Sequence, residues 1–261
     1  HKQHRSCRYF LGSREMTLHS FFKRMICVSI ISGFLIGGYT IPYAAAGIGN
    51  LSANISIFNQ YSFRGIDQSG EEAAIQGGFD WAHGLGFYIG TWASNVDFND
   101  NDSVTEFDFY GGYNRELQNG INIDLSMVGY TYPGAYDSSN YDYYEYSFGL
   151  EKSIEAVSFS TAINYSPEFF GKSGDATYLQ GGLDYEFQEI TVSAHIGKQW
   201  IELETTYGAP DYVDYSIGAS YVLHGFDISV VYVDTDVDAG WNSTDQSGKE
   251  GRAIFGVSKS F

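Results

Sequence analysis

From residue 51 to the end of the chain, apolar and polar side chains alternate with a period of two. In 51–64, for example, Ile55, Ile57, Tyr61 and Phe63 take apolar positions, whereas Arg64 takes a polar one. A β-strand points successive side chains to opposite faces, while a helix repeats its faces every 3.6 residues. The pattern therefore predicts an all-β chain whose strands have one apolar and one polar face.

The alternation recurs often enough to predict about twelve strands. The connections after the even-numbered strands are tight, as at 83–85, and those after the odd-numbered strands are mostly longer and polar, as at 235–250. Tight turns at one end and long loops at the other are typical of outer-membrane barrels. The expected strands are 51–64, 73–82, 86–98, 104–116, 120–132, 140–152, 156–166, 176–187, 189–200, 212–223, 225–234 and 251–261.

We therefore expect residues 47–261 to form one domain, a transmembrane antiparallel up-and-down β-barrel. Closure pairs every backbone N–H and C=O group within the sheet, as a hydrocarbon surrounding requires. A soluble β-sandwich is the alternative, because it also contains strands of period two. Aromatic residues near the strand ends favour the barrel, since they suit girdles at two membrane interfaces: Tyr61, Phe63, Trp92, Phe98, Tyr143, Tyr144 and Tyr146.

Residues 1–46 differ in character from the rest and are expected to be an N-terminal extension with a cleaved signal peptide. Lys23 and Arg24 precede an apolar run over 25–41, and small residues up to Ala46 follow it. A membrane anchor is the alternative, but the run is shorter than the roughly 20 residues of a spanning helix. Cys7 and Cys27 both lie in this segment, so the expected mature chain needs no disulfide in an oxidising compartment.

The charge balance bears on partners, because 14 Lys and Arg oppose 32 Asp and Glu, for a net charge of −18. Such a chain repels nucleic acid, so no nucleic-acid partner is expected. If the polar strand faces line the lumen, an acidic lining concentrates cations there. The candidate pore-lining residues are Arg64, Asp80, Glu106, Asp108, Asp124, Glu145, Asp184, Asp214 and Asp227, with Arg252 and Lys152 as further bases.

The lining predicts a channel for passive diffusion of small hydrophilic solutes or ions, with a weak preference for cations and no cofactor. Arg64 is either a constriction residue or a structural partner for acids across the barrel. Bulky inward residues offer the alternative of an occluded barrel with a structural or adhesion role: Gln60, Tyr110, Tyr130 and Tyr178.

A lipid hydrolase is the rival from another class, since such barrels use a Ser and a His on the outer wall. His83 and His224 fall in expected turns, and His195 shares the inward face with Ser193. No Gly-x-Ser-x-Gly nucleophile motif was found, and we expect no enzyme.

The last long loop contains acids at offsets similar to those of a calcium loop: Asp234, Asp236, Asp238 and Asp245. Ala239 stands where the turn glycine belongs, so we expect no dedicated metal site. Solvated loop acids, bridged to lipopolysaccharide by divalent cations, are the expected role.

The last strand carries Ala253, Phe255, Val257 and Phe261 on one face. A terminal aromatic in this pattern looks like the C-terminal signal that the barrel-assembly machinery of the outer membrane reads. Lys259 departs from it, although a lysine near the interface can extend its ammonium group to water.

Several stretches of the chain resemble the TorF family of porins. They include YSFRGIDQS at 61–69, AIQGGFD at 74–80, GFYIGTWASNVDF at 86–98, YPG at 132–134 and YSPEFFG at 165–171. The likeness covers essentially the whole expected mature chain. It implies an outer-membrane protein assigned as a porin, without a known substrate or catalytic residue.

Overall fold

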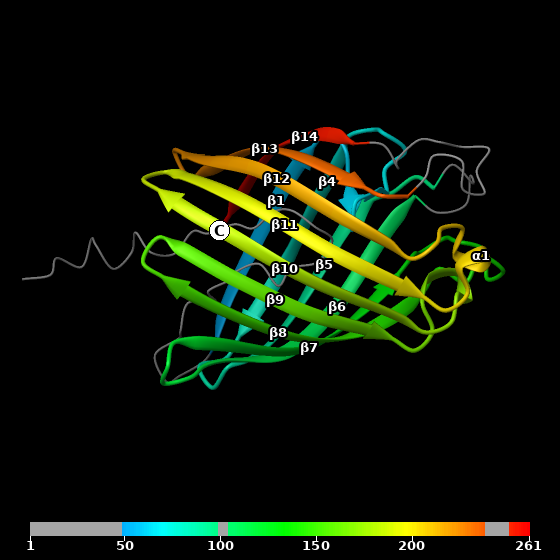
Figure 1. The fold of residues 1–261 in the computed structure, drawn as a ribbon, viewed down its shortest axis with the longest axis horizontal. Helices are drawn as coiled ribbons and strands as arrows, with labels where there is room; N and C mark the ends of the chain where they lie inside the picture. The colour runs from blue at the N-terminus through cyan, green and yellow to red at the C-terminus, as the bar shows by residue number, and fades with distance from the viewer. Residues whose placement is uncertain (1–48, 99–103, 238–250) are drawn as a thin grey trace, which may run out of the picture.

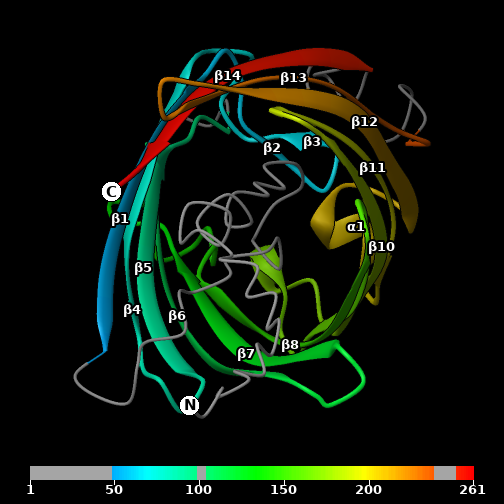
Figure 2. The same cartoon turned by 90° about the vertical axis from the view of Figure 1, so that its left-hand side faces the viewer.

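The computed structural model describes residues 49–98, 104–237 and 251–261. The predicted signal peptide, residues 1–46, therefore lies outside the described residues. Within the described part, the chain forms a closed barrel of twelve antiparallel strands, each paired with its sequence neighbours, and β1 pairs with β14 to close it (Figures 1 and 2). The predicted up-and-down barrel is confirmed.

The barrel strands agree with the predicted runs to within a few residues, apart from the first. They are β1 (Asn50–Phe58), β4 (Ala74–Ala82), β5 (Phe87–Asn95), β6 (Thr105–Glu116), β7 (Ile121–Thr131), β8 (Tyr143–Ile154), β9 (Val157–Ser166), β10 (Ala176–Phe187), β11 (Ile190–Ile201), β12 (Tyr212–Leu223), β13 (Phe226–Thr235) and β14 (Arg252–Ser260).

Short and long connections separate to the two ends of the barrel, which we call the turn end and the loop end. At the turn end, on the left of Figure 1, Gln188 has a φ of 59°, and His224 and Gly225 have φ values of 52° and 78°. Positive φ values are characteristic of the tight turns that match the twist of a β-hairpin. The loop end carries two short helical segments, η3 (Phe170–Lys172) and α1 (Glu204–Tyr207).

No described helix has the length and apolar character needed to cross a membrane.

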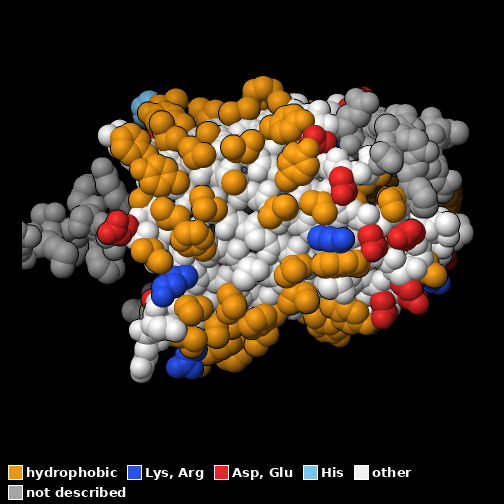
Figure 3. Space-filling view, viewed as in Figure 1, with side chains coloured by type: hydrophobic (Ala, Val, Ile, Leu, Met, Phe, Trp, Pro, Cys, Tyr) orange, Lys and Arg blue, Asp and Glu red, His pale blue; other side chains and the backbone are white. Residues whose placement is uncertain are grey.

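The outer face of the barrel is apolar along its length, as the alternation predicts. Ile55, Phe79 and Ile217 are 48%, 62% and 60% exposed, and they represent a large set of outward aliphatic and aromatic side chains. Figure 3 shows these side chains covering the barrel wall, while acidic side chains gather toward the loop end. A continuous apolar surface of this kind suits contact with hydrocarbon rather than water.

The predicted position of Lys152, beside the inward acids, is wrong. It pairs in register with Ile121 and Phe159, which are outward residues. Its side chain is therefore on the outer face at the turn end, where a lysine can reach the aqueous interface.

The predicted first strand, 51–64, is too long. Asn59 ends β1: its side chain accepts a hydrogen bond from the Phe255 N–H at 2.6 Å and donates one to the Ala253 carbonyl at 3.3 Å. Residues 59–73 then turn into the barrel, and we call this segment the inward loop (Figure 2). It contains a small hairpin of β2 (Ser62–Phe63) and β3 (Ile66–Asp67).

Most of the aromatic residues assigned to membrane girdles lie in the lumen instead. Tyr61, Phe63, Trp92 and Tyr143 are at most 8% exposed and belong to one cluster of buried residues, with Phe98 packed against it. Of the set, Tyr144 and Tyr146 face outward, with 38% and 50% exposure. The girdle interpretation is wrong for the buried residues because an inward loop offers them a packing surface inside the barrel.

Candidate functional site

All the predicted lumen acids are on inward-facing strand positions, where they alternate with exposed apolar residues. Glu106, Asp108, Glu145 and Asp214 lie toward the loop end, and Asp80, Asp124, Asp184 and Asp227 lie toward the turn end. Their role as the lining of an open pore stays a prediction.

Three of the turn-end acids, Asp80, Asp124 and Asp184, accept hydrogen bonds from side chains of other strands. The Tyr88 hydroxyl donates to both carboxylate oxygens of Asp124 at 3.0 Å. The Tyr110 hydroxyl donates to Asp80, and the Ser193 hydroxyl donates to Asp184 at 2.5 Å. These donors hold each carboxylate against the wall in a defined position.

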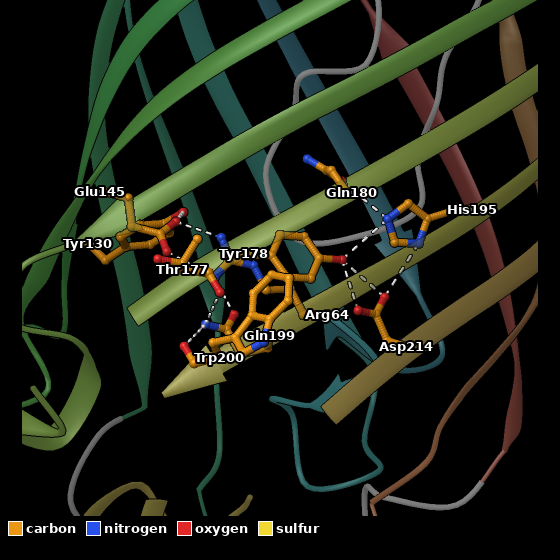
Figure 4. A network of polar contacts seen from close by, with 10 residues as sticks. All are labelled: Arg64, Tyr130, Glu145, Thr177, Tyr178, Gln180, His195, Gln199, Trp200 and Asp214. Atoms are coloured by element: carbon orange, nitrogen blue, oxygen red, sulfur yellow. Dashed lines mark hydrogen bonds and ion pairs between the residues drawn. The ribbon is translucent and has the colours of Figure 1, made fainter. Parts of the chain in front are cut away.

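Arg64 is in the lumen, as expected, but it does not come from the barrel wall. It lies at the tip of the inward loop, and its guanidinium crosses to β8 (Figure 4). There it forms a bidentate pair with Glu145, with Nη1–Oε1 and Nη2–Oε2 distances of 2.9 and 2.7 Å. The side chains are 2% and 4% exposed. The geometry supports the structural-partner role for Arg64.

Further contacts surround the guanidinium on the same side of the lumen. Nη1 of Arg64 also donates to Gln199 Oε1 on β11 at 2.8 Å. The ring centroids of Phe63 and Tyr178 lie 4.7 and 4.1 Å from the Cζ atom of Arg64. The Tyr178 hydroxyl continues the network to Asp214 on β12 at 2.9 Å. One side chain from the inward loop thus joins several strands across the lumen.

The charge on Arg64 is stabilised by its partner. Burial by itself lowers the pKa of a guanidinium, but the Glu145 carboxylate more than compensates, so the pKa of Arg64 is raised. Arg64 therefore keeps its positive charge in this buried position.

The two strands of the small hairpin meet at a tight turn made by Arg64 and Gly65, with φ values of 47° and 78°. A Cβ at Gly65 would lie 2.3 Å from the Thr235 side chain on β13, so only glycine permits this close approach. The Gly65 carbonyl accepts a hydrogen bond from Arg252 on β14 at 2.6 Å. The turn is held against the wall on one side while Arg64 reaches the other.

A second set of contacts fixes the base of the inward loop. Ser69 accepts a hydrogen bond from the Tyr61 N–H at 2.9 Å and donates to the Glu72 carbonyl at 2.7 Å. The Asp97 N–H donates to the Gln68 carbonyl at 2.8 Å, which ties the loop to the connection after β5. The loop is thus held at both its base and its tip.

Glu106 and Asp108 form a buried acidic pair on β6, below the inward loop. Their side chains are 1% and 0% exposed. The Tyr61 hydroxyl donates to Glu106 Oε1 at 3.4 Å, and the other three carboxyl oxygens of the pair have no hydrogen-bond partner. Burial raises the pKa of Tyr61, and Glu106 and Asp108 raise it further, so this hydroxyl stays protonated.

Aromatic residues and backbone bonds join the loops above the lumen. The rings of Tyr141 and Phe170 stack with centroids 4.6 Å apart. The Gly171 N–H donates to the Asn140 carbonyl at 3.0 Å, and the Leu203 N–H donates to the Ser173 carbonyl at 2.9 Å. Three of the long loops are therefore linked to one another at the loop end.

The histidines do not form a lipase-like site within the described residues. His195 faces the lumen, with Nε2 3.2 Å from the Tyr178 hydroxyl and Nδ1 3.4 Å from Asp214. The hydroxyl of Ser193 goes to Asp184 rather than to His195. His83 and His224 are in connections at the turn end.

Within the same described ranges, no cluster of three or more His, Cys, Asp or Glu residues is arranged to hold a metal ion. In the calcium-like pattern, Asp234 and Asp236 are described, and Asp238 and Asp245 lie outside the described residues.

The inward loop is the part of the site that the sequence analysis missed. Its local signal is the four-residue stretch from Phe63 to Ile66, in which two apolar residues flank a Gly-containing pair, a pattern typical of a tight hairpin. Gln199 was also missed, although its inward register on β11 follows from the alternation that identified His195.

Comparison with solved structures shows the fold of outer-membrane porins. The KdgM porin is 14% identical, with a TM-score of 0.54 over 80% of this chain and 99% of that one. The NanC porin is 8% identical, with a TM-score of 0.53 over 79% and 97%. An outer membrane channel from Pseudomonas putida F1 is 8% identical, with a TM-score of 0.52 over 84% and 98%.

No curated protein matches the sequence. A family model described as a bacterial protein of unknown function, Gcw_chp, matches residues 43–261. The match spans the whole barrel. The chain therefore belongs to the Gcw_chp family of bacterial proteins.

Proposed function

We propose that this protein is a channel of the bacterial outer membrane that allows passive diffusion of small hydrophilic solutes, with a weak preference for cations. The observation that carries the proposal is a closed barrel with an apolar outer face and an inner face rich in carboxylates. The porin fold of the neighbours and the resemblance to the TorF family support the same assignment.

The charges on the inner face of the barrel favour cations. Arg64 is the base at the tip of the inward loop, and its charge is matched by Glu145 at 2.7 Å. Asp124 and Asp227 face the turn-end half of the lumen without a salt bridge within the described residues, and Asp184 lies on the same face. Fixed negative charge in a narrow passage raises the local concentration of cations and opposes anions.

The inward loop sets where the passage is narrowest. Arg64, Tyr130 and Gln199 are at most 2% exposed, so the lumen is densely filled at their level. Solutes that pass the loop end must move through the space that the inward loop leaves, which restricts the channel to small solutes.

The test is single-channel conductance of the purified, membrane-inserted protein in a planar bilayer with a salt gradient. We expect discrete current steps and a reversal potential that indicates cation preference. Asp124→Asn should weaken that preference, whereas Glu155→Gln, at an exposed turn, serves as the control and should change it less. Anion preference would refute the charge argument.

A second candidate is an occluded barrel with a structural or adhesion role, favoured by the dense packing around Arg64. If folded and inserted protein gives no current steps, this candidate replaces the channel. In either case we propose an outer-membrane location, contact with lipopolysaccharide, and recognition of β14 and Phe261 by the barrel-assembly machinery.

A further inference from the structure

The buried acidic pair on β6 has more acceptor oxygens than the protein supplies with donors. Glu106 and Asp108 are two positions apart on one strand face, and their carboxyl groups contact each other. Glu106 Oε2 and both carboxyl oxygens of Asp108 are buried with no hydrogen-bond partner. The two carboxyl groups therefore lie within hydrogen-bond reach of each other, and the Tyr61 hydroxyl is the donor that another described residue supplies to them.

Such an arrangement needs a positive species. Buried carboxylates without partners are strongly unfavourable, because they lose hydration and repel each other. Arg64 is the cationic side chain of the inward loop, and its guanidinium is committed to Glu145 and Gln199. Either a shared proton or a bound cation can compensate the pair.

The surroundings favour a cation. The phenol of Tyr61 approaches Glu106 from the inward loop, so a neutral oxygen adjoins the two carboxyl groups. In register, Ser94 lies opposite Glu106 and Trp92 lies opposite Asp108. The Ser94 hydroxyl donates its proton to the Asn95 carbonyl at 2.9 Å, which leaves its oxygen lone pairs as a further ligand for a cation. Oxygen ligands of this kind, with flexible geometry, suit Ca²⁺, whereas Mg²⁺ requires a near-ideal octahedron.

We propose that Glu106 and Asp108, together with the hydroxyl of Tyr61, bind a hard divalent cation of the calcium class inside the lumen. Two carboxylates match its charge, and water completes its coordination. With so few protein ligands, we expect a dissociation constant on the order of 10⁻⁴–10⁻³ M. The bound ion would also link β6 to the inward loop through Tyr61.

This inference deepens the proposed function and rests on it in one respect, since the ion reaches the site through a lumen that admits cations. The ion would then occupy a defined point along that path. Binding and conduction are measured separately, so that each can fail without the other.

The experiment uses Tb³⁺ as a luminescent substitute for Ca²⁺ on the full folded protein in detergent. The Tyr61 and Trp92 ring centroids are 5.5 Å apart, so excitation of these rings can be transferred to an ion bound at the Tyr61 hydroxyl. We expect saturable emission that Ca²⁺ displaces. Asp108→Asn should weaken the affinity at least about tenfold, because ligand charge sets affinity at such sites.

The control is Glu155→Gln, which removes one acidic charge at an exposed turn outside the lumen. It should keep the Tb³⁺ affinity of the unaltered protein. If Asp108→Asn does not fold, Tyr61→Phe and Glu106→Gln test the same site and should each weaken Tb³⁺ binding.

Absence of Ca²⁺-displaceable emission, or emission that none of the three site variants changes, would overturn the inference and leave a shared proton as the compensating species. If Tb³⁺ binds as expected but the protein gives no current steps, the site stands and the channel proposal fails. If the protein conducts but does not bind Tb³⁺, the channel proposal stands and the site fails.

Discussion

Replacement of Arg64 by Met tests whether a single ion pair fastens the inward loop to the far side of the barrel. The change keeps an unbranched side chain of similar length but removes the charge. It breaks both bonds to Glu145 and the bond to Gln199. It also leaves the Glu145 carboxylate buried, where the Tyr130 hydroxyl still donates to it at 3.1 Å.

The expected cost follows from that residual charge. Removing one partner of a buried ion pair typically lowers the free energy of unfolding by about 3–5 kcal/mol, because the other charge stays buried. The Glu145 side chain is 4% exposed, so water can screen it very little. The double variant Arg64→Met with Glu145→Gln leaves no unpaired charge, and we expect it to recover most of the loss.

The assay is urea unfolding of the folded barrel, followed by tryptophan fluorescence, for the single and double variants. Single-channel recordings of Arg64→Met should show larger or noisier current steps, because the loop tip is released. The reasoning would be refuted if Arg64→Met lowered the free energy of unfolding by less than about 1 kcal/mol, because that is the contribution of a solvent-exposed ion pair. It would also fail if the double variant were as unstable as the single one.

Three further predictions test other parts of the structure. Gly65→Ala should lower stability more than Gly120→Ala: both positions have positive φ, but a Cβ at Gly65 meets β13 at 2.3 Å, whereas nothing lies within 4 Å of one at Gly120. Denaturant midpoints of the two variants check this, and equal losses would contradict the close approach. Ile217→Lys, mid-strand on the outer face, should lower the free energy of unfolding in a lipid bilayer by about 2–4 kcal/mol, and Leu223→Lys, near the turn end, should lower it by about 0–1 kcal/mol. Equal losses would contradict the placement of Ile217 at the middle of the membrane. Deletion of Phe261, whose backbone pairs with Ala53 at the seam, should reduce the amount of folded protein in the outer membrane, as measured by heat-modifiable electrophoretic mobility; an unchanged amount would exclude its role in assembly.

The barrel itself could be predicted from the sequence because its signal is local. Each strand alternates apolar and polar residues, and the length of each connection is visible in the chain. Ile55 and Ile217 point outward, and Asp124 and Asp184 point inward, as the period of two requires. The acidic lining follows from the same alternation, since a strand residue's face depends on its register and not on distant contacts.

The inward loop could not be predicted in this way, because its position depends on groups far away in the sequence. Arg64 and Glu145 are 81 residues apart, and Arg64 and Gln199 are 135 residues apart. The alternation continues through Tyr61 and Phe63 as if β1 did not end. The Asn59 side chain ends the strand by bonding to β14, which becomes its neighbour only when the barrel closes.

The sequence by itself therefore determined the strands, their two faces and the charge of the lumen. Tertiary structure decided what fills that lumen. Aromatic residues are equally suited to a membrane interface and to a packed interior. The register places Tyr143 on the same strand face as Glu145, but it does not show what Trp92 and Tyr143 pack against. The physical reason is that hydrophobic alternation records only which face is apolar, whereas ion pairing and packing across the barrel depend on strands that folding brings together.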